Sequence, residues 1–347
     1  MNRLRDDEAD ARHEVVATDS DRPRIKTRLL FAVGIGIVGG LLCYGNHLTP
    51  WGRPGDFGQS WFGARSIVGG INPYPLVGPG KTYESPWPLL YPATSFLVAM
   101  PVAWLPLVWA TVVFAAVSSA LLAYSVTETG WHRWPMFGSA PFIFAAGSAQ
   151  WSPLFTAALT IPVIAIAFAA KPTIGIGLAA AGSVRVQKYA AYGGLLLLIA
   201  SMIWLPSWLP QWAENVGTAT HITSPLLRTG GIFVLLALIR WKRPEARLIL
   251  ALACVPQSGA WYEALPLFLV AATRAEAMLL AVLSCFGFLL YYPRMDLGSE
   301  VQVNHDVGAL IVALVYLPAV IMVLRRPNEG EVPAWLKKLS GSIRPQR

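Results

Sequence analysis

The sequence predicts an all-α polytopic membrane protein that crosses the bilayer about ten to twelve times, with both termini on the cytoplasmic side. Three observations lead to this prediction: a hydrophobic composition, a series of apolar runs, and a one-sided distribution of Lys and Arg. Of the 347 residues, 55% are hydrophobic and only 13% are charged. Soluble globular proteins carry about 25% charged residues, so this composition argues against an ordinary soluble domain.

The apolar runs define the expected spans. A helix needs about 20 apolar residues to cross a bilayer, and fewer when neighbouring helices cover its ends. The clear candidates are residues 29–45, 89–104, 106–125, 189–205, 229–240, 276–291 and 307–324. The stretch 136–184 is broken by prolines and is expected to form three short spans. The stretch 248–273 is interrupted at 256–259, which predicts a helical hairpin.

The basic residues orient these spans. With the N-terminus inside, 20 of the 27 Lys and Arg fall on the cytoplasmic side, as the positive-inside rule requires. The seven expected outside are Arg53, Arg65, Lys81, Arg133, Lys171, Arg228 and Arg294. Topology therefore explains the formal net charge of +8. No nucleic-acid partner is expected, because the basic residues are scattered between apolar runs.

The chain divides into three parts on this basis. Residues 1–28 are expected to form a basic, disordered cytoplasmic tail, and 325–347 a second basic cytoplasmic tail. Residues 29–324 form a single multi-pass domain in the cell membrane. No small-residue cleavage site follows the first apolar run, so a retained anchor is expected instead of a signal peptide.

The loop at 46–88 is the longest polar connection and is expected on the outer side. Loops of this length are uncommon unless they are functional, and its many aromatic residues suit short helices that lie in the membrane interface. Residues 57–68 have helical apolar spacing, preceded by Gly55 and Asp56 as a helix start. A second outer loop, 206–228, carries His221 and Arg228.

Six short motifs follow one another along the chain, and their order is informative. They are residues 55–57, 69–74, 90–92, 149–153, 171–172 and 256–263. This order resembles the GT-C superfamily of membrane glycosyltransferases, and most of all glycosyltransferase family 87, the polyprenyl-phosphate-mannose-dependent mannosyltransferases. The resemblance extends from residue 29 to about 275. Two positions depart from the family pattern. Ala93 replaces a second proline after Tyr91-Pro92, and Tyr262-Glu263 stand where the family often has a histidine.

The resemblance implies a GT-C-like fold whose active site lies in the outer loop 46–88. It implies inverting transfer of a sugar, most readily mannose, from a polyprenyl-phosphate donor to a glycolipid or glycan acceptor among the membrane lipids. Asp56 would be the general base that takes the proton of the acceptor hydroxyl. No Asp-x-Asp pair lies in the outer loops, so neither a metal nor another cofactor is expected.

The leaving phosphate needs cations or hydrogen-bond donors as its negative charge grows. The candidates for binding the donor or the acceptor are Arg65, Tyr74, Tyr91, Gln150, Lys171, His221, Arg228, Tyr262 and Glu263.

Two other functions stay open. A transporter or flippase of lipid-linked sugar would place charges at mid-span and broken helices in two repeated halves. The sequence has few mid-span charges and no clear internal repeat. A catalytically inactive GT-C-like scaffold is the other alternative, because Tyr262 and Glu263 depart from the family pattern.

Overall fold

A computed structural model describes residues 24–49, 55–219, 222–292 and 300–330, which are mostly helical and include two short strands. Within these described residues, five helices are long and apolar enough to cross a membrane. They are α2 (Ile25–His47), α5 (Leu107–Val126), α9 (Val184–Trp204), α12 (Arg274–Tyr291) and a continuous run of α13 (Glu300–Ile311), a π-helical turn η11 (Val312–Tyr316) and α14 (Leu317–Leu324). These helices coincide with five of the expected spans, so the chain is a helical membrane protein.

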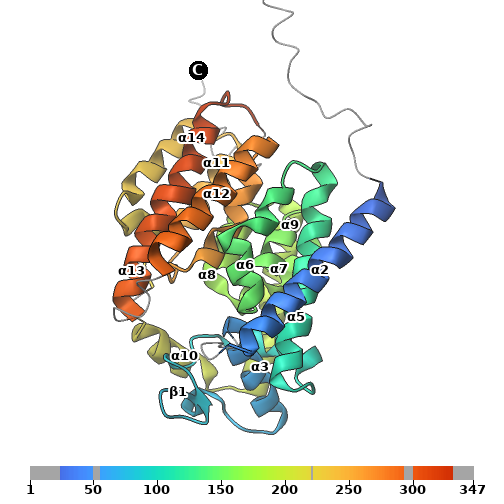
Figure 1. Cartoon of the computed structure of the whole chain (residues 1–347). Helices are drawn as coiled ribbons and strands as arrows, with labels where there is room; N and C mark the ends of the chain where they lie inside the picture. Colours follow the sequence, from blue (N-terminus) through green and yellow to red (C-terminus); the bar gives the residue numbers. More distant parts are fainter. Residues whose placement is uncertain (1–23, 50–54, 220–221, 293–299, 331–347) are drawn as a thin grey trace, which may run out of the picture.

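Helices α2 and α5 pack antiparallel along most of their length (Figure 1). Arg28 near the start of α2 donates to the carbonyl of Tyr124, 2.7 Å away, near the end of α5. At the other end, His47 is hydrogen-bonded to Thr111 Oγ1 at 2.8 Å. We call the end of the molecule marked by Arg28 the tail end, and the end marked by His47 the loop end.

The other apolar segments of the bundle are short helices. They are α6 (Ala140–Gly147), α7 (Ser152–Ala157), η6 (Pro162–Ala170), α8 (Pro172–Ala181), η8 (Gly231–Arg240), α11 (Pro244–Cys254) and η9 (Trp261–Val270). Ten residues of α-helix extend about 15 Å, which is half of a hydrocarbon core about 30 Å thick. The expected spans at 136–184, 229–240 and 248–273 are therefore half-length helices, and the expected total of about twelve full crossings is not what the structure shows.

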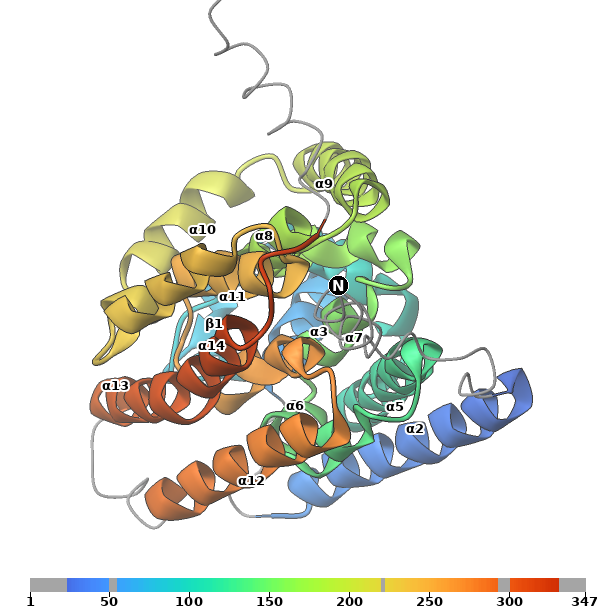
Figure 2. The same cartoon turned by 90° about the horizontal axis from the view of Figure 1, so that it is seen from above.

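These half-length helices meet in turns inside the bundle. Helices α6 and α7 join at residues 148–151, η6 and α8 join at Lys171, and α11 and η9 join at 255–260. The last pair is the hairpin expected from the sequence. Thr223, ahead of η7 (Pro225–Leu227), forms an antiparallel bridge with Gln257 in the same region. Figure 2 shows α6 and α7 near the centre, with α2, α9, α12 and α13 around them.

The loop end consists of short elements from two separate parts of the sequence (Figure 1). They are α3 (Gly55–Val68), η2 (Tyr74–Leu76), the parallel two-residue strands β1 (Val77–Gly78) and β2 (Tyr83–Glu84), α4 (Ala93–Ala99), η3 (Met100–Val102) and α10 (Trp208–Gly217). Helix α3 confirms the helix expected over 57–68. Trp212 and Asn215 of α10 donate to the carbonyls of Leu90 and Leu89, which fixes α10 against the first loop.

The segment 89–104, expected as a full span, stays at the loop end. The indole of Trp61 in α3 donates to the carbonyl of Leu105 at 3.1 Å, just after η3. Helix α5 therefore starts at the loop end and finishes at the tail end, where η4 (Thr127–Thr129) and η5 (Trp134–Gly138) follow. The helical part of this segment, α4 and η3, spans only residues 93–102. It is too short to cross about 30 Å of hydrocarbon, so the expected span does not form.

This path places Arg133 at the tail end, although the sequence suggested the outer side. Arg133 donates to the carbonyls of Leu269 and Ala271. Arg326, which follows α14, donates to Val270 between them. The correction moves one more basic residue to the end of the molecule where α2 begins and α14 ends.

Helix α2 begins at Ile25, four residues before the expected first span, and α14 ends at Leu324. Residues 1–23 and 331–347 lie outside the described part. The two ends of the described chain lie at the tail end (Figure 1).

Candidate functional site

A buried ion pair joins two residues that are 115 positions apart. Lys171 Nζ lies 2.6 Å from Asp56 Oδ2. Lys171 occupies the turn between η6 and α8, and Asp56 lies in the first turn of α3. The side chains are 11% and 19% exposed. Ionisable residues are expensive within a membrane protein and usually mark a functional site, so this pair is the starting point for the site.

Local backbone geometry brings Asp56 to this position. Gly55 adopts a positive φ of 55°, and a Cβ at that residue would collide with the carbonyl of Ser148. The N–H of Phe57 donates to the carbonyl of Ala149, which itself has a φ of 45°. Only glycine allows the start of α3 to approach the 148–150 turn so closely. The acidic residue in the first turn also suits the helix dipole.

Two further donors surround the Asp56 carboxylate. The side-chain amide of Gln150 lies against the carboxylate, and when its nitrogen is assigned to the Asp56 side it donates to both oxygens, at 3.2 Å from Oδ1. Tyr91 forms a side-chain hydrogen bond with the same carboxylate. Burial raises the pKa of Tyr91 well above its ordinary value, and the charge of Asp56 adds to this effect. The phenol of Tyr91 therefore stays protonated and acts as the donor.

Lys171 also contacts the turn that begins η9. Its ammonium donates to Tyr262 Oη at 3.1 Å and lies 4.5 Å from the centroid of that ring. Glu263 Oε1 is 3.9 Å from Lys171 Nζ, and its side chain is only 2% exposed. The Glu263 carboxylate accepts the backbone N–H groups of Ser258 and Gly259 at 3.1 and 3.0 Å. The ammonium of Lys171 thus lies within 4 Å of both the Asp56 and the Glu263 carboxylates.

The structure brings together six of the residues that the sequence analysis singled out. We call them the Asp56–Lys171 cluster: Asp56, Tyr91, Gln150, Lys171, Tyr262 and Glu263. They come from separate segments of the chain, each at or beside the end of a short helix.

The other four candidates do not join the cluster. Tyr74 is buried behind it, and its hydroxyl donates to the carbonyl of Tyr91 at 3.0 Å. Arg65 is exposed at the end of α3 and lies over the ring of Trp61. Arg228 is buried in a different turn, where its guanidinium donates to backbone carbonyls. His221 lies outside the described residues.

Ser258 is a neighbour of the cluster that the sequence analysis did not select. Its Oγ lies 3.2 Å from Tyr262 Oη, and its N–H holds Glu263. The available signal was the sequence Ser258-Gly259 inside an apolar stretch, which marks a turn. That signal predicts a break in the helix but does not indicate which polar groups the break presents.

An apolar cavity of about 250 Å³ lies next to the cluster. Helices α6 and α12 line it through Ala140, Ile143, Phe144, Cys285, Phe288 and Leu289. The ring of Phe144 stacks on that of Tyr262, with centroids 5.8 Å apart. A single aromatic layer therefore separates hydrocarbon-like space from the residues that surround Lys171.

This arrangement has a definite chemical capacity. A carboxylate that can accept a proton lies beside an ammonium that can bind an anion, and phenol and amide donors surround both. Within the described ranges, no three His, Cys, Asp or Glu side chains gather as metal ligands. Comparisons with protein-family models, curated proteins and solved structures give no match to this chain. The chemistry of the site is therefore argued from its own geometry.

Proposed function

We propose that the chain is an inverting glycosyltransferase with a GT-C-like fold. It would move a sugar, most readily mannose, from a polyprenyl-phosphate donor to a glycolipid or glycan acceptor at the outer face of the cell membrane. The observation that carries the proposal is the contact between Asp56 and Lys171. The transfer needs a general base and a phosphate-binding cation in one site, and Asp56 and Lys171 supply this pair, with their direct contact giving way as the substrate enters between them.

The bonds in the reaction balance without a cofactor. The acceptor hydroxyl attacks the anomeric carbon of the donor and loses its proton to the Asp56 carboxylate. The bond from that carbon to the phosphate oxygen breaks, and the electron pair leaves with the polyprenyl phosphate. Lys171 and the hydroxyl of Tyr262 stabilise the negative charge that grows on the leaving oxygen.

Lys171 has the donor capacity for this role. An ammonium offers three N–H groups, and Asp56 and Tyr262 accept two of them. An arriving phosphate would compete with Asp56 for the ammonium and release the carboxylate. Gln150 and Tyr91 would keep that carboxylate oriented while Lys171 binds the phosphate.

The apolar cavity supports a lipid-linked donor. It adjoins Tyr262 through Phe144, and apolar side chains line it. Its volume of about 250 Å³ is below the about 300–1,000 Å³ typical of small-molecule pockets. It therefore fits part of a hydrocarbon chain, with the rest lying in the bilayer and the phosphate directed toward Lys171.

A transfer assay tests the proposal. Purified protein in nanodiscs receives polyprenyl-phosphate sugars and membrane glycolipids, with EDTA in every reaction. We expect transfer by the wild type and a loss of about a hundredfold or more in Asp56→Asn, the scale of a missing general base. Asp306→Asn is the matched control, because that carboxylate is exposed on α13. Full activity of Asp56→Asn would reject Asp56 as the base, and no transfer by the wild type would favour an inactive scaffold.

One observation favours a second candidate, a carrier of lipid-linked sugar. Half-length helices that meet around a buried charge are typical of transporters, and the Asp56–Lys171 cluster lies where several short helices meet. A carrier would move labelled lipid-linked sugar across a vesicle bilayer without forming a new glycosidic bond. Product analysis of the same reconstituted protein separates the two candidates.

A further inference from the structure

We infer that Arg228 is a positioning residue that fixes the 255–260 turn and, through it, Glu263 and Lys171. Its effect on sugar transfer rests on the proposed function, whereas its effect on the turn does not. Three features of the structure lead to this inference: the partners of the guanidinium, the space around it, and the short path from it to Lys171.

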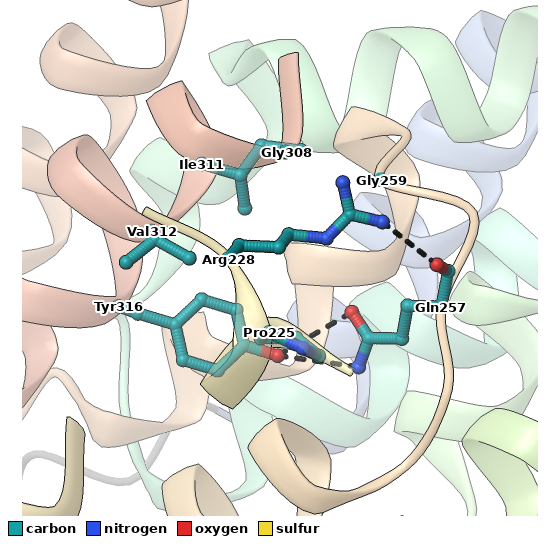
Figure 3. A pocket seen from close by; sticks show the side chains of 8 residues that line it. All are labelled: Pro225, Arg228, Gln257, Gly259, Gly308, Ile311, Val312 and Tyr316. Atoms are coloured by element: carbon teal, nitrogen blue, oxygen red, sulfur yellow. Dashed lines mark hydrogen bonds between the residues drawn. The ribbon is translucent and has the colours of Figure 1, made fainter. Parts of the chain in front are cut away.

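The Arg228 guanidinium joins three separate segments of the chain, as Figure 3 shows in part. Nη1 donates to the carbonyl of Asn304 in α13 at 2.9 Å. Nη2 donates to the carbonyl of Gln257 at 2.9 Å and to that of Thr223 at 3.4 Å. The residue is only 6% exposed. Among the described residues, no carboxylate forms an ion pair with it.

The Arg228 guanidinium lies in a narrow slot beside Gly259 and Gly308. A Cβ at Gly308 would collide with Nη1, and a Cβ at Gly259 would lie 2.6 Å from the same atom. Gly259 also has a positive φ of 83°. The adjoining cavity is only about 10 Å³ in volume, and Gln257 and Tyr316 help to line it. The two glycines thus permit an arginine here that larger residues would exclude.

A short path connects this slot to the Asp56–Lys171 cluster. Arg228 holds the carbonyl of Gln257, and the side-chain amide of Gln257 donates to Leu252 O at 2.8 Å and to Tyr316 Oη at 3.2 Å. The next two residues in the chain supply the N–H groups that hold Glu263. Glu263 in turn faces Lys171. Loss of Arg228 would free the turn, so Glu263 would lose its backbone donors and Lys171 its second carboxylate.

The geometry requires arginine and not merely a positive charge. A guanidinium presents a rigid planar fork of donors, whereas a lysine ammonium is a point charge on a flexible stem. Three carbonyls from three segments need divergent donors at fixed angles. We therefore expect Arg228→Lys to behave like Arg228→Gln at this position.

The reactivity of a single introduced cysteine tests the local effect directly. Ser258→Cys is made with Cys254 and Cys285 replaced, which leaves the buried Cys43. We expect Arg228→Lys and Arg228→Gln to raise the rate at which a water-soluble thiol reagent modifies the thiol at position 258 by at least about tenfold, the effect of losing one charge-assisted hydrogen bond. Gly308→Ala should do the same, because it fills the slot while Arg228 remains.

Arg240 provides the matched control. It ends η8, the helix that follows the Arg228 turn, and donates to the carbonyl of Leu324 at 3.0 Å. Arg240→Lys and Arg240→Gln remove the same kind of contact at the tail end. They should leave the reactivity at position 258 unchanged. Equal reactivity in the Arg228 variants and the wild type, or an equal rise in the Arg240 variants, would overturn the inference.

The transfer assay supplies the second readout. At matched thermal stability, Arg228→Lys should raise KM for the polyprenyl-phosphate donor by at least about fivefold, since a displaced Lys171 binds phosphate less well, and Arg240→Lys should not. An unchanged donor KM in Arg228→Lys would remove the link to Lys171. If the wild type transfers no sugar, the proposed function fails, while the cysteine result still decides whether Arg228 fixes the turn.

Discussion

Lys171 faces the buried carboxylate of Glu263 and the partly buried carboxylate of Asp56, so its single charge offsets part of their combined negative charge. Asp56 has three donors and Glu263 has two backbone donors in addition to Lys171. Removing one partner of a buried ion pair costs about 3–5 kcal/mol, because the remaining charge is left uncompensated.

Lys171→Met should therefore lower the free energy of unfolding by about 3–5 kcal/mol. A second substitution, Glu263→Gln, should recover part of that loss, because it removes one of the two uncompensated charges. Thermal unfolding of both proteins in detergent measures the effect. A double variant no more stable than Lys171→Met would contradict the charge-balance account.

His132 gives the protein a pH dependence at the tail end. Burial, and then the charge of Arg133, lower the pKa of His132 to about 4. Between pH 6.5 and 4 the unfolded chain binds this proton and the folded chain does not, so stability falls as the pH falls through this window. We expect His132→Gln to flatten the decline in melting temperature between these pH values. An identical decline in both proteins would contradict this expectation.

At the scale of single residues, six of the ten candidates from the sequence lie together because their motifs form turns that the fold gathers. The sequence did not predict which neighbours pair. Arg65 follows Asp56 by nine residues, and at 3.6 residues per turn this spacing puts the two side chains on opposite faces of α3. Arg228 was expected in the second outer loop as a ligand-binding candidate, and no sequence pattern shows that Gly259 and Gly308 form a slot for it.

Glycines along one face of α2 allow this helix to pack closely against α5. A Cβ at Gly39 would collide with Ser119 of α5, and one at Gly36 would lie 3.0 Å from the carbonyl of Ala116. Small residues let transmembrane helices approach in this way. Gly34, on the other face of α2, has no neighbour within 4 Å of an added Cβ.

Gly39→Val should therefore destabilise the protein by about 1–3 kcal/mol, the usual cost of overpacking, whereas Gly34→Val should have little effect. The two variants carry the same helix-propensity change, so their difference isolates the contact with α5. Thermal unfolding of both in one detergent makes the comparison. Equal destabilisation would mean that propensity, and not packing, dominates.

At the scale of elements, hydropathy located nearly every apolar helix but not its length across the membrane. The stretch 89–104 is as apolar as a span, yet Trp61 holds its end at the loop end. Pro162 and Pro172 are the first residues of short helices. Sequence alone does not show whether such helices meet inside the bundle or cross it. Tertiary contacts decide this question.

The path of the chain makes a prediction for the whole molecule. Because α5 runs from the loop end to the tail end, Glu128 should lie on the same side of the membrane as Arg325, and Lys81 on the opposite side. Cysteines placed singly at these three exposed positions can be labelled in sealed, oriented vesicles. Labelling of positions 81 and 128 from the same side would restore the topology expected from hydropathy and contradict the structure.

For the whole molecule, the prediction of a helical membrane protein is confirmed, and the side of the membrane that carries most of the positive charge stays a prediction. Arg133 was assigned to the wrong end because the segment 89–104 was counted as a crossing. One miscounted crossing reverses the predicted side of every later segment until a second miscount reverses it back. The stretches 136–184 and 248–273 each begin and end at the tail end, because their half-length helices run into the bundle and back in pairs. The predicted orientation of the later spans therefore agrees with the structure again.

Binding of polyprenyl monophosphate, the expected product lipid, tests the central claim most directly. Lys171→Met should weaken binding to the purified protein by about tenfold or more, because it removes the cation that meets the phosphate. Asp56→Asn should bind the same lipid at least as tightly as the wild type, because it removes a competing negative charge, and yet transfer no sugar. If the two variants lose binding equally, or both bind as the wild type does, then Asp56 and Lys171 form a structural ion pair and not an active site.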